Sequence, residues 1–362
     1  MSRFRVAILG TGFGRSVQAP GFQRHPGFDL VAIAGSRPEK TRRIADQLGI
    51  PEAFDDWRQL LDQAKPDLVS IATPADLHHP MMLEALARGA HVLCEKPTAL
   101  HRFQAAEMRD RARSLGRLAG INHEFRFFPA RRLALRLARE GAIGTARRGE
   151  ILGRYPIWPT PQARGPTWLS EQSRGGGILG ALGSHHTDCF RTFFGEPESV
   201  LASVRVDQPR RGPTPAEPES AIATADDGCT LEYRFANGAT GLIDLSATAP
   251  YRWERFEIHG STGSLRWDET GYRLWHIAAG SDPEEIEIPA ELRLSRREGD
   301  PALAAPFAVL VDGFHRALLG EGRLDPDFQD AVAVQSALDA ARASNSAGAR
   351  MRVEIPAAIE AR

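Results

Sequence analysis

The chain has 362 residues, which is too long for one typical hydrophobic core and predicts two domains. Hydrophobic residues make up 42% and charged residues 25% of the sequence, as in an ordinary globular protein. The formal net charge of −1 lacks the basic excess that nucleic-acid and anionic-membrane binding favour, so we expect neither partner.

Strand and helix patterns alternate through the first third of the chain. Short apolar runs end at glycine, serine or proline, and amphipathic stretches follow them. Such short connections predict βαβ units, and therefore a doubly wound parallel sheet over residues 1–124. The expected strands are 4–9, 30–34, 68–72, 92–94 and 117–121, and the expected helices are 38–48, 81–87 and 103–115.

The pattern changes after about residue 125, where strands follow one another. Asn237-Gly238 between two of them is a strong hairpin signal. The succession predicts an α+β domain over 125–362, with a large, mostly antiparallel open sheet and helices on one side. The expected strands are 149–155, 199–206, 229–235, 240–246, 256–259 and 264–267, and the expected helices are 130–140, 178–194, 306–319 and 327–344.

Cysteine content indicates the compartment. Cys94, Cys189 and Cys229 are too few and too scattered for a disulfide framework or a zinc-ribbon spacing, so we expect a reducing, cytoplasmic setting. A first strand from residue 4 leaves no room for a signal peptide. No apolar run approaches the roughly 20 residues of a membrane helix.

A glycine-rich loop, Gly10-Thr11-Gly12-Phe13-Gly14, follows the first expected strand. In a dinucleotide fold the first glycine makes a tight turn and the second lets the pyrophosphate approach the backbone. The third glycine of the usual spacing would fall at Arg15, so the match is partial, with Gly14 one residue early. Because a strand precedes the loop and a second strand follows about 20 residues later, we expect a bound dinucleotide.

The end of the second strand carries Ser36-Arg37 and no carboxylate until Glu39. An acidic residue there would bind the adenosine ribose diol of NAD. A hydroxyl beside a guanidinium suits a 2′-phosphate instead, so we predict a preference for NADP. The alternative is that Arg37 only stacks beside the adenine and both cofactors bind.

Glu95-Lys96-Pro97 follows the strand at 92–94. A residue before proline is held in an extended conformation, so Lys96 would stand at the strand tip. Ligands collect at the carboxyl ends of the strands of an open α/β sheet. We therefore predict that Lys96 is a proton-transfer group, although most lysines are solvated surface charges.

The stretch from Gly175 to Asp188 joins a run of glycines to Ser184-His185-His186. His185 and Asp188 are three residues apart and would share a helix face. A metal site from His185, Asp188 and Cys189 is conceivable, but no second ligand cluster accompanies it and we expect none. We expect His185 to be an acid/base group near the nicotinamide, and a hydrogen-bonded core histidine is the alternative.

Together these motifs resemble the Gfo/Idh/MocA family of oxidoreductases. The resemblance covers nearly the whole chain, and the order and spacing of the motifs are more specific than any one of them. The matching segments are the glycine loop, Thr73-Pro74 through His78, Glu95-Lys96-Pro97, Phe125 to Pro129, Gly175 to Asp188 and Gly260 to Gly263.

The resemblance implies hydride transfer between a nicotinamide and a sugar or polyol carbon, with Lys96 and His185 as catalytic residues. It also implies a homodimer or homotetramer, with the second-domain sheet as an interface. Cofactor contacts are expected from Gly10, Thr11, Gly12, Phe13, Gly14, Ser36, Arg37, Thr73, Pro74, His78, Glu95, Lys96 and Pro97. Substrate contacts are expected from Arg126, Trp168, His185 and Asp188.

The chain departs from the family at Ala181. Much of the family has an aspartate four residues before the histidine, where helical spacing would place it beside His185. Two alternatives therefore stay open. One is redox-assisted glycoside cleavage with a tightly held cofactor, and the other is a non-catalytic NADP-binding sensor or partner protein.

Overall fold

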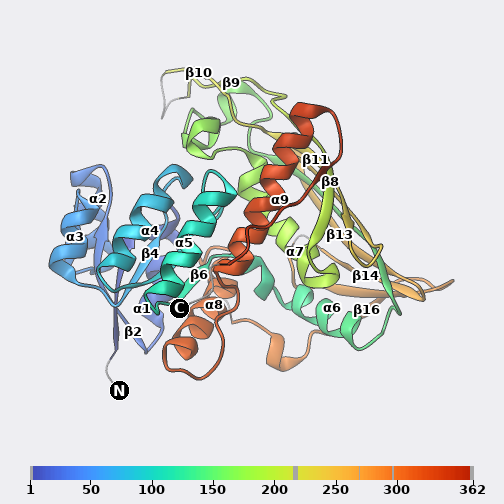
Figure 1. Ribbon diagram of the computed structural model, residues 1–362, viewed down its shortest axis with the longest axis horizontal. Coiled ribbons are helices and arrows are strands. Elements are labelled where there is room, and N and C mark those ends of the chain that lie inside the picture. The colour runs from blue at the N-terminus through green and yellow to red at the C-terminus, as the bar shows by residue number, and fades with distance from the viewer. Residues whose placement is uncertain (1–2, 215–218, 269, 296, 359–362) are drawn as a thin grey trace. The chain divides into compact units, whose positions relative to one another are not determined.

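The computed structural model describes residues 3–214, 219–268, 270–295 and 297–358, which form two compact units (Figure 1). Unit 1 contains the described residues of Met1–Phe127, Leu294–Val332 and Pro356–Arg362, and unit 2 contains those of Phe128–Arg293 and Ala333–Ile355. The change of pattern along the chain predicts that all of 125–362 belongs to the second domain. The structure instead returns two later segments to unit 1, because an apolar helix among them completes its core.

Unit 1 is built on a six-stranded sheet in the order β3-β2-β1-β4-β5-β6, and every neighbouring pair is parallel. This confirms the predicted doubly wound sheet. The strands are β1 (Phe4–Leu9), β2 (Phe28–Ala34), β3 (Glu52–Phe54), β4 (Leu68–Ile71), β5 (His91–Cys94) and β6 (Ala119–Ile121). The helices are α1 (Ala19–Arg24), α2 (Pro38–Leu48), α3 (Trp57–Ala64), α4 (His78–Ala87), α5 (Arg102–Ser114) and α8 (Ala304–Leu318).

Helix α8 is far from the sheet in sequence but packs into the core of unit 1. Phe307 and Phe314 are fully buried there. The Phe307 ring meets the Phe22 ring edge-on with centroids 5.7 Å apart, and Phe22 in turn meets Phe28. These aromatic contacts close one face of the sheet, so the first 127 residues do not contain their whole core.

Unit 2 contains a nine-stranded sheet in the order β16-β15-β14-β13-β7-β12-β11-β8-β17. Only the β12–β7 pair is parallel among these described strands, so the expected mostly antiparallel sheet is confirmed. The strands are β7 (Ala146–Pro156), β8 (Pro197–Arg205), β11 (Gly228–Phe235), β12 (Thr240–Ser246), β13 (Thr248–Gly260), β14 (Gly263–Trp267), β15 (Leu274–Ala278), β16 (Glu284–Ile286) and β17 (Met351–Arg352). A separate two-stranded ribbon pairs β9 (Arg210–Arg211) with β10 (Ala221–Ile222).

Helices α6 (Pro129–Arg139) and α7 (Ser184–Phe194) cover one face of this sheet (Figure 1). Two glycines that pair across neighbouring strands, Gly149 and Gly241, admit the ring of Phe190 from α7. A Cβ at these positions would lie 2.4 and 2.6 Å from that ring. Because these two residues have no side chain, α7 can pack closely against β7 and β12, and α7 also carries His185.

Helix α9 (Phe328–Ala347) begins in unit 1 and ends in unit 2. The remaining elements are single helical turns, several of which follow strands. They are η1 (Gly14–Gln18), η2 (Ala75–Leu77), η3 (Glu124–Phe127), η4 (Pro161–Ala163), η5 (Trp168–Ser170), η6 (Gln172–Arg174), η7 (Leu179–Gly183) and η8 (Ala290–Leu292). None of the helices in the described ranges is long and apolar enough to cross a membrane.

Candidate functional site

The glycine loop follows β1 and lies against the end of β4. Gly10 has φ +118°, and a Cβ there would lie 2.2 Å from the carbonyl oxygen of Ala72. A Cβ on Gly14 would lie 2.8 Å from the Ile8 side chain. The protein's own packing therefore requires glycine at both positions.

Gly12 is a glycine for a different reason. In the described part of the chain, no heavy atom lies within 4 Å of the place its Cβ would occupy, and the residue is exposed. Its missing side chain leaves room for a ligand to reach the backbone. A π-helical turn, η1, begins two residues later, and such turns are frequent at functional sites. The loop thus fits the pyrophosphate of a dinucleotide.

Ser36 and Arg37 lie beside this loop and are both exposed. A Cβ on Gly35 would lie 2.6 Å from the Thr11 side chain, so the turn after β2 touches the glycine loop. The Thr41 hydroxyl holds that turn by donating to the carbonyl oxygens of Gly35 at 3.2 Å and Arg37 at 2.9 Å. Arg37 forms no ion pair with any described residue, so its guanidinium is available to an anion.

His78 connects the loops that follow β4 and β5. Its ring is 1% exposed, with Nε2 2.9 Å from the Thr73 carbonyl oxygen and Nδ1 3.0 Å from that of Pro97. Burial lowers the pKa of His78, against the opposing effect of these carbonyl oxygens. The histidine predicted to contact the cofactor therefore holds together the two loops that carry Thr73-Pro74 and Lys96.

Glu95 is the centre of a buried hydrogen-bond network. Its Oε1 accepts from Gln18 Nε2 at 3.0 Å and from Asn122 Nδ2 at 2.5 Å, and its Oε2 accepts from the Lys96 backbone N–H at 3.3 Å. Ser70 extends the network by donating to Gln18 Oε1 at 2.9 Å. Burial raises the pKa of Glu95, against the lowering effects of Lys96 and of these donors. The carboxylate fixes the backbone from which the half-buried Lys96 projects.

Glu124 is a second carboxyl group beside Lys96, and the sequence analysis did not select it. It lies in η3, directly after β6, and is 1% exposed. Burial first, and then repulsion from Glu95, raise its pKa to about 8, while Lys96 opposes the rise. The sequence does contain a signal for Glu124, because it follows a strand of the parallel sheet just as Lys96 does.

In unit 2, α7 carries His185, which is 1% exposed. The predicted continuous helix over 178–194 is replaced by a π-helical turn, η7, followed by α7. Ala181 lies inside that turn, where the wider spacing replaces the α-helical stacking of residues four apart. Residue 181 therefore does not stand one α-helical turn before His185, as the expected position of an aspartate beside this histidine requires.

The next histidine, His186, is a core residue. Its ring lies 5.6 Å from that of Phe256, and burial, followed by the charge of Arg131, lowers its pKa to about 3. The side chain is therefore neutral at ordinary pH.

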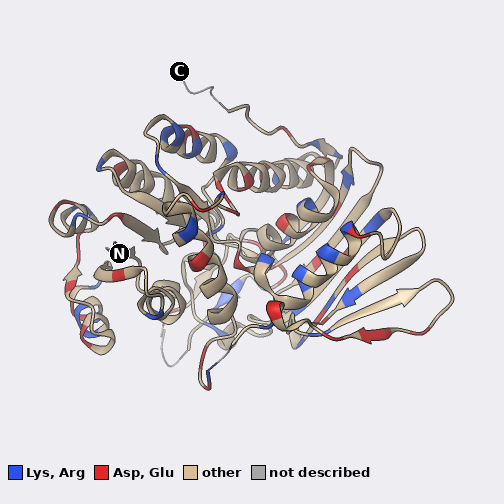
Figure 2. Ribbon diagram, turned by 90° about the horizontal axis from the view of Figure 1, so that it is seen from below, with Lys and Arg blue, Asp and Glu red and all other residues tan. Residues whose placement is uncertain are grey.

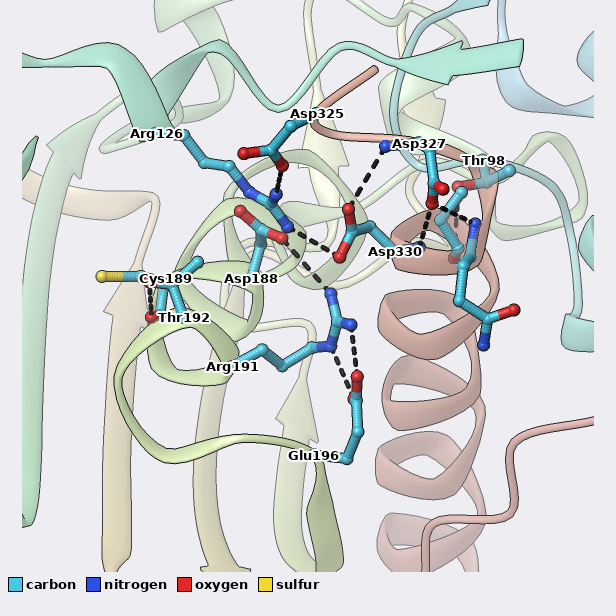
Figure 3. Close-up of polar contacts among 12 residues, drawn as sticks. Thr98, Arg126, Asp188, Cys189, Arg191, Thr192, Glu196, Asp325, Asp327 and Asp330 are labelled. Atoms are coloured by element: carbon cyan, nitrogen blue, oxygen red, sulfur yellow. Dashed lines mark hydrogen bonds and ion pairs between the residues drawn. The ribbon is translucent and has the colours of Figure 1, made fainter. Parts of the chain in front are cut away.

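Asp188 is fully buried among arginines of unit 2. Its carboxylate lies 3.5 Å from the Arg131 guanidinium. It also lies 3.4 Å from the guanidinium of Arg191, which in turn binds Glu196 (Figure 3). A buried carboxylate in such a network is neutralised by its own unit. These ion pairs hold the Asp188 side chain in place, and its contact with substrate stays a prediction.

Arg126 and Trp168 were the other predicted substrate contacts. Arg126, in η3, forms ion pairs with Asp325 and, at 2.9 Å, with Asp330, all within unit 1 (Figure 3). Trp168 begins η5 in unit 2 and is partly exposed. Within the described ranges, no three His, Cys, Asp or Glu side chains are grouped to hold a metal ion.

Comparison with protein families gives two matches along the chain. Residues 4–123 match the oxidoreductase family with an NAD-binding Rossmann fold, and residues 132–266 match the GFO/IDH/MocA C-terminal domain. These ranges lie in unit 1 and unit 2 respectively.

Curated relatives match over most of their length. Levoglucosan dehydrogenase of Pseudarthrobacter phenanthrenivorans is 27% identical, with 92% of this chain and 94% of the relative aligned. Myo-inositol 2-dehydrogenase of Thermotoga maritima is also 27% identical, over 72% and 74%. D-glucoside 3-dehydrogenase of Escherichia coli is 32% identical, over 54% and 55%.

Solved structures share the whole fold. An oxidoreductase domain protein from Kribbella flavida has a TM-score of 0.88 at 25% identity, covering 98% of this chain and 100% of its own. Levoglucosan dehydrogenase in complex with NADH and levoglucosan also has a TM-score of 0.88, at 24% identity and the same coverage.

Proposed function

This chain belongs to the Gfo/Idh/MocA oxidoreductases, and we propose that it transfers a hydride between NADP and a sugar or polyol carbon. The observation that carries the proposal is the carboxyl-end edge of the parallel sheet in unit 1. The open Gly12 follows β1, the exposed Arg37 follows β2, and Lys96 follows β5. Parallel strands bring these ends to one edge, where dinucleotides bind.

The preference for NADP is supported by Ser36 and Arg37. Both are exposed beside the glycine loop, and no carboxylate stands at the end of β2. A charge-assisted hydrogen bond contributes about 1.5–3 kcal/mol, so Arg37→Ala should weaken NADPH binding about 10- to 100-fold and NADH binding little. Arg43→Ala, at an exposed position on α2, the helix that follows Arg37, is the control. Tighter binding of NADH than NADPH by the unaltered protein would refute the preference.

Lys96 and His185 are proposed as the proton-transfer groups. When bound, the cofactor supplies the hydride acceptor or donor at its nicotinamide. Lys96 would exchange the proton of the reacting hydroxyl, and His185 would orient that oxygen or share the proton. Support comes from the network that fixes the backbone at Lys96 and from the burial of His185 on a helix set by glycine packing.

The experiment on Lys96 separates chemistry from binding. General acid–base groups contribute about 10² to 10⁴ in rate, so Lys96→Ala should lose that much in kcat while cofactor affinity remains. Lys65→Asn is the control, because Lys65 is exposed before the opposite end of β4 and has φ +43°, which asparagine tolerates. Unchanged kcat in Lys96→Ala would remove Lys96 from the mechanism.

The substrate class is proposed from the relatives, which are named as acting on levoglucosan, myo-inositol and glucosides. We propose Trp168 as an apolar wall for a sugar ring, supported by its partial exposure. A spectrophotometric screen of sugars, polyols and their keto forms with NADP and NAD tests the class. Cleavage of a nitrophenyl glycoside without added cofactor, and without net reduction, would contradict net hydride transfer.

We also propose a homodimer or homotetramer formed through the outer face of the nine-stranded sheet. Arginine–glutamate pairs such as Arg148–Glu150 alternate along it with partly exposed apolar residues such as Leu152, and Figure 2 shows both charges mixed on these strands. Sedimentation analysis should show an oligomer that Leu152→Asp dissociates, whereas Ile222→Asp, on the separate ribbon, should not. A monomer in the unaltered protein would refute the proposal.

A cytoplasmic location is proposed from the cysteines. Cys94, Cys189 and Cys229 are all buried and free, as in a reducing compartment. Cell fractionation tests this location, and recovery outside the cytoplasm would contradict it.

A further inference from the structure

Three ionisable residues, Glu95, Lys96 and Glu124, follow the neighbouring strands β5 and β6. These strands are neighbours, with Cys94 paired to Ile121, and the Asn122 N–H donates to the Cys94 carbonyl oxygen at 2.7 Å. Glu95 and Lys96 leave one strand, and Glu124 follows the other. Glu95 and Glu124 are 6% and 1% exposed, so both carboxyl groups are nearly closed to water, and the charge of Glu95 acts on Glu124.

The hydrogen bonds assign the negative charge within this cluster. Amide N–H groups of Gln18 and Asn122 and the backbone N–H of Lys96 can only donate, so together they favour the ionised form of Glu95. Two like charges cannot both be held cheaply in a buried site. Glu124 is therefore the carboxyl group that takes a proton, in agreement with its raised pKa.

Other charged groups near η3 are engaged elsewhere. Helix α8 packs against η3, and its Asp312 lies 3.2 Å from Arg316 and 3.6 Å from His25. His315 on the same helix meets the rings of Phe4 and Phe28 edge-on, and Arg126 binds aspartates of its own unit. Glu95 raises the pKa of Glu124 and Lys96 lowers it, and the buried imidazole of His123 is the neighbour of Glu124 in the chain.

We propose that Glu124 is a positioning residue that sets the charge state of Lys96. With Glu124 protonated, Glu95 and Lys96 form a balanced pair, so Lys96 releases its proton to solvent more readily, and the neutral amine then accepts the hydroxyl proton as the hydride leaves for the nicotinamide. With Glu124 ionised, the cluster carries one excess negative charge, which holds the proton on Lys96. The balance between alcohol oxidation and ketone reduction then changes with pH through Glu124. This inference rests on the proposed function of Lys96.

The sequence offers a direct measurement, because it contains only three lysines, Lys40, Lys65 and Lys96. Reductive dimethylation with a 13C label keeps their charge and gives one NMR signal each. Lys40 and Lys65 are exposed and serve as internal references. In Glu124→Gln, which copies the neutral acid, the Lys96 signal should titrate about one pH unit lower than in the unaltered protein. Glu124→Asp should restore the original midpoint.

Activity provides the second readout. In Glu124→Gln the pH dependence of kcat/KM for alcohol oxidation should move about one unit lower, and exposed Glu107→Gln should leave it in place. An unmoved Lys96 signal would overturn the inference even if the enzyme is active. A moved signal with an unmoved pH profile would overturn the claim that Glu124 controls the reaction. Failure of the function itself would appear separately, as full activity in Lys96→Ala.

Discussion

Replacing Phe314 by alanine tests whether α8, which lies in the last third of the chain, is part of the hydrophobic core of unit 1. The side chain is fully buried on α8, and Gly120 in β6 lies so close that a Cβ there would be 3.0 Å from its ring. Buried Phe→Ala changes cost about 3–5 kcal/mol. For a unit of about 150–250 residues each kcal/mol lowers Tm by about 2–4 °C, so unit 1 should melt about 6–20 °C lower.

The assay is urea unfolding combined with hydrogen exchange, because two units need not unfold together. Peptides of β1 and β6 should lose protection, and those of β11 and β12 should keep it. Leu319→Ala, on an exposed residue directly after α8, is the matched control and should change little. A loss below about 1 kcal/mol in Phe314→Ala, or protection lost first in unit 2, would refute the packing argument.

Three further predictions follow from single contacts. Gly12→Ala should weaken cofactor binding and leave the melting temperature unchanged, whereas Gly10→Ala should weaken binding and also lower the melting temperature. Equal changes of melting temperature in the two variants would contradict the claim that packing requires glycine at position 10 and not at position 12. In the folded protein the pKa of His186 is about 3, below its ordinary value of 6.5. Protonation of His186 therefore favours the unfolded chain, so the free energy of unfolding is highest above pH 6.5 and falls by about 1.4 kcal/mol per pH unit as the pH falls toward 3. Urea titrations of His186→Gln should lack this slope. Arg211→Ala should cost about 3–5 kcal/mol in urea unfolding, because it removes the guanidinium 2.9 Å from the fully buried Asp227 carboxylate. A loss under 1 kcal/mol would show that the backbone N–H groups of Asp207 and Gln208, or water, suffice to hold that charge.

Local signals predicted much of the secondary structure. The strand Phe4–Leu9 and the helix Pro38–Leu48 were predicted with the bounds observed. A short apolar run marks the strand, and a proline at the first position and a glycine after the last mark the helix. Strand β3 and helix α3 were missed, although Asp56 caps α3 by accepting from the Arg58 N–H at 2.8 Å. Strands β15 to β17 were missed because they are short and lie near the sheet edges.

Some residues of the candidate site could be predicted from the sequence and others could not. The glycine loop and Lys96 could be found in the sequence, because both follow strands of a parallel sheet and the chain order fixes which edge they share. Glu124 could not be ranked, since its importance depends on burial and on two charged neighbours from another strand. The ion pairs of Asp188 and Arg126 could not be foreseen for the same reason, because their partners lie on other elements, and their substrate contacts stay predictions.

The sequence by itself therefore determined the alternation of strands and helices, the family, and the edge of the sheet at which we propose that a cofactor binds. Each of these depends on residues that are neighbours in the chain. Tertiary structure decided that α8 completes unit 1, that Gln18 and Asn122 hold Glu95, and that a π-helical turn precedes His185. Those contacts join segments tens to hundreds of residues apart, and packing and desolvation, which create them, leave no periodic trace in the sequence.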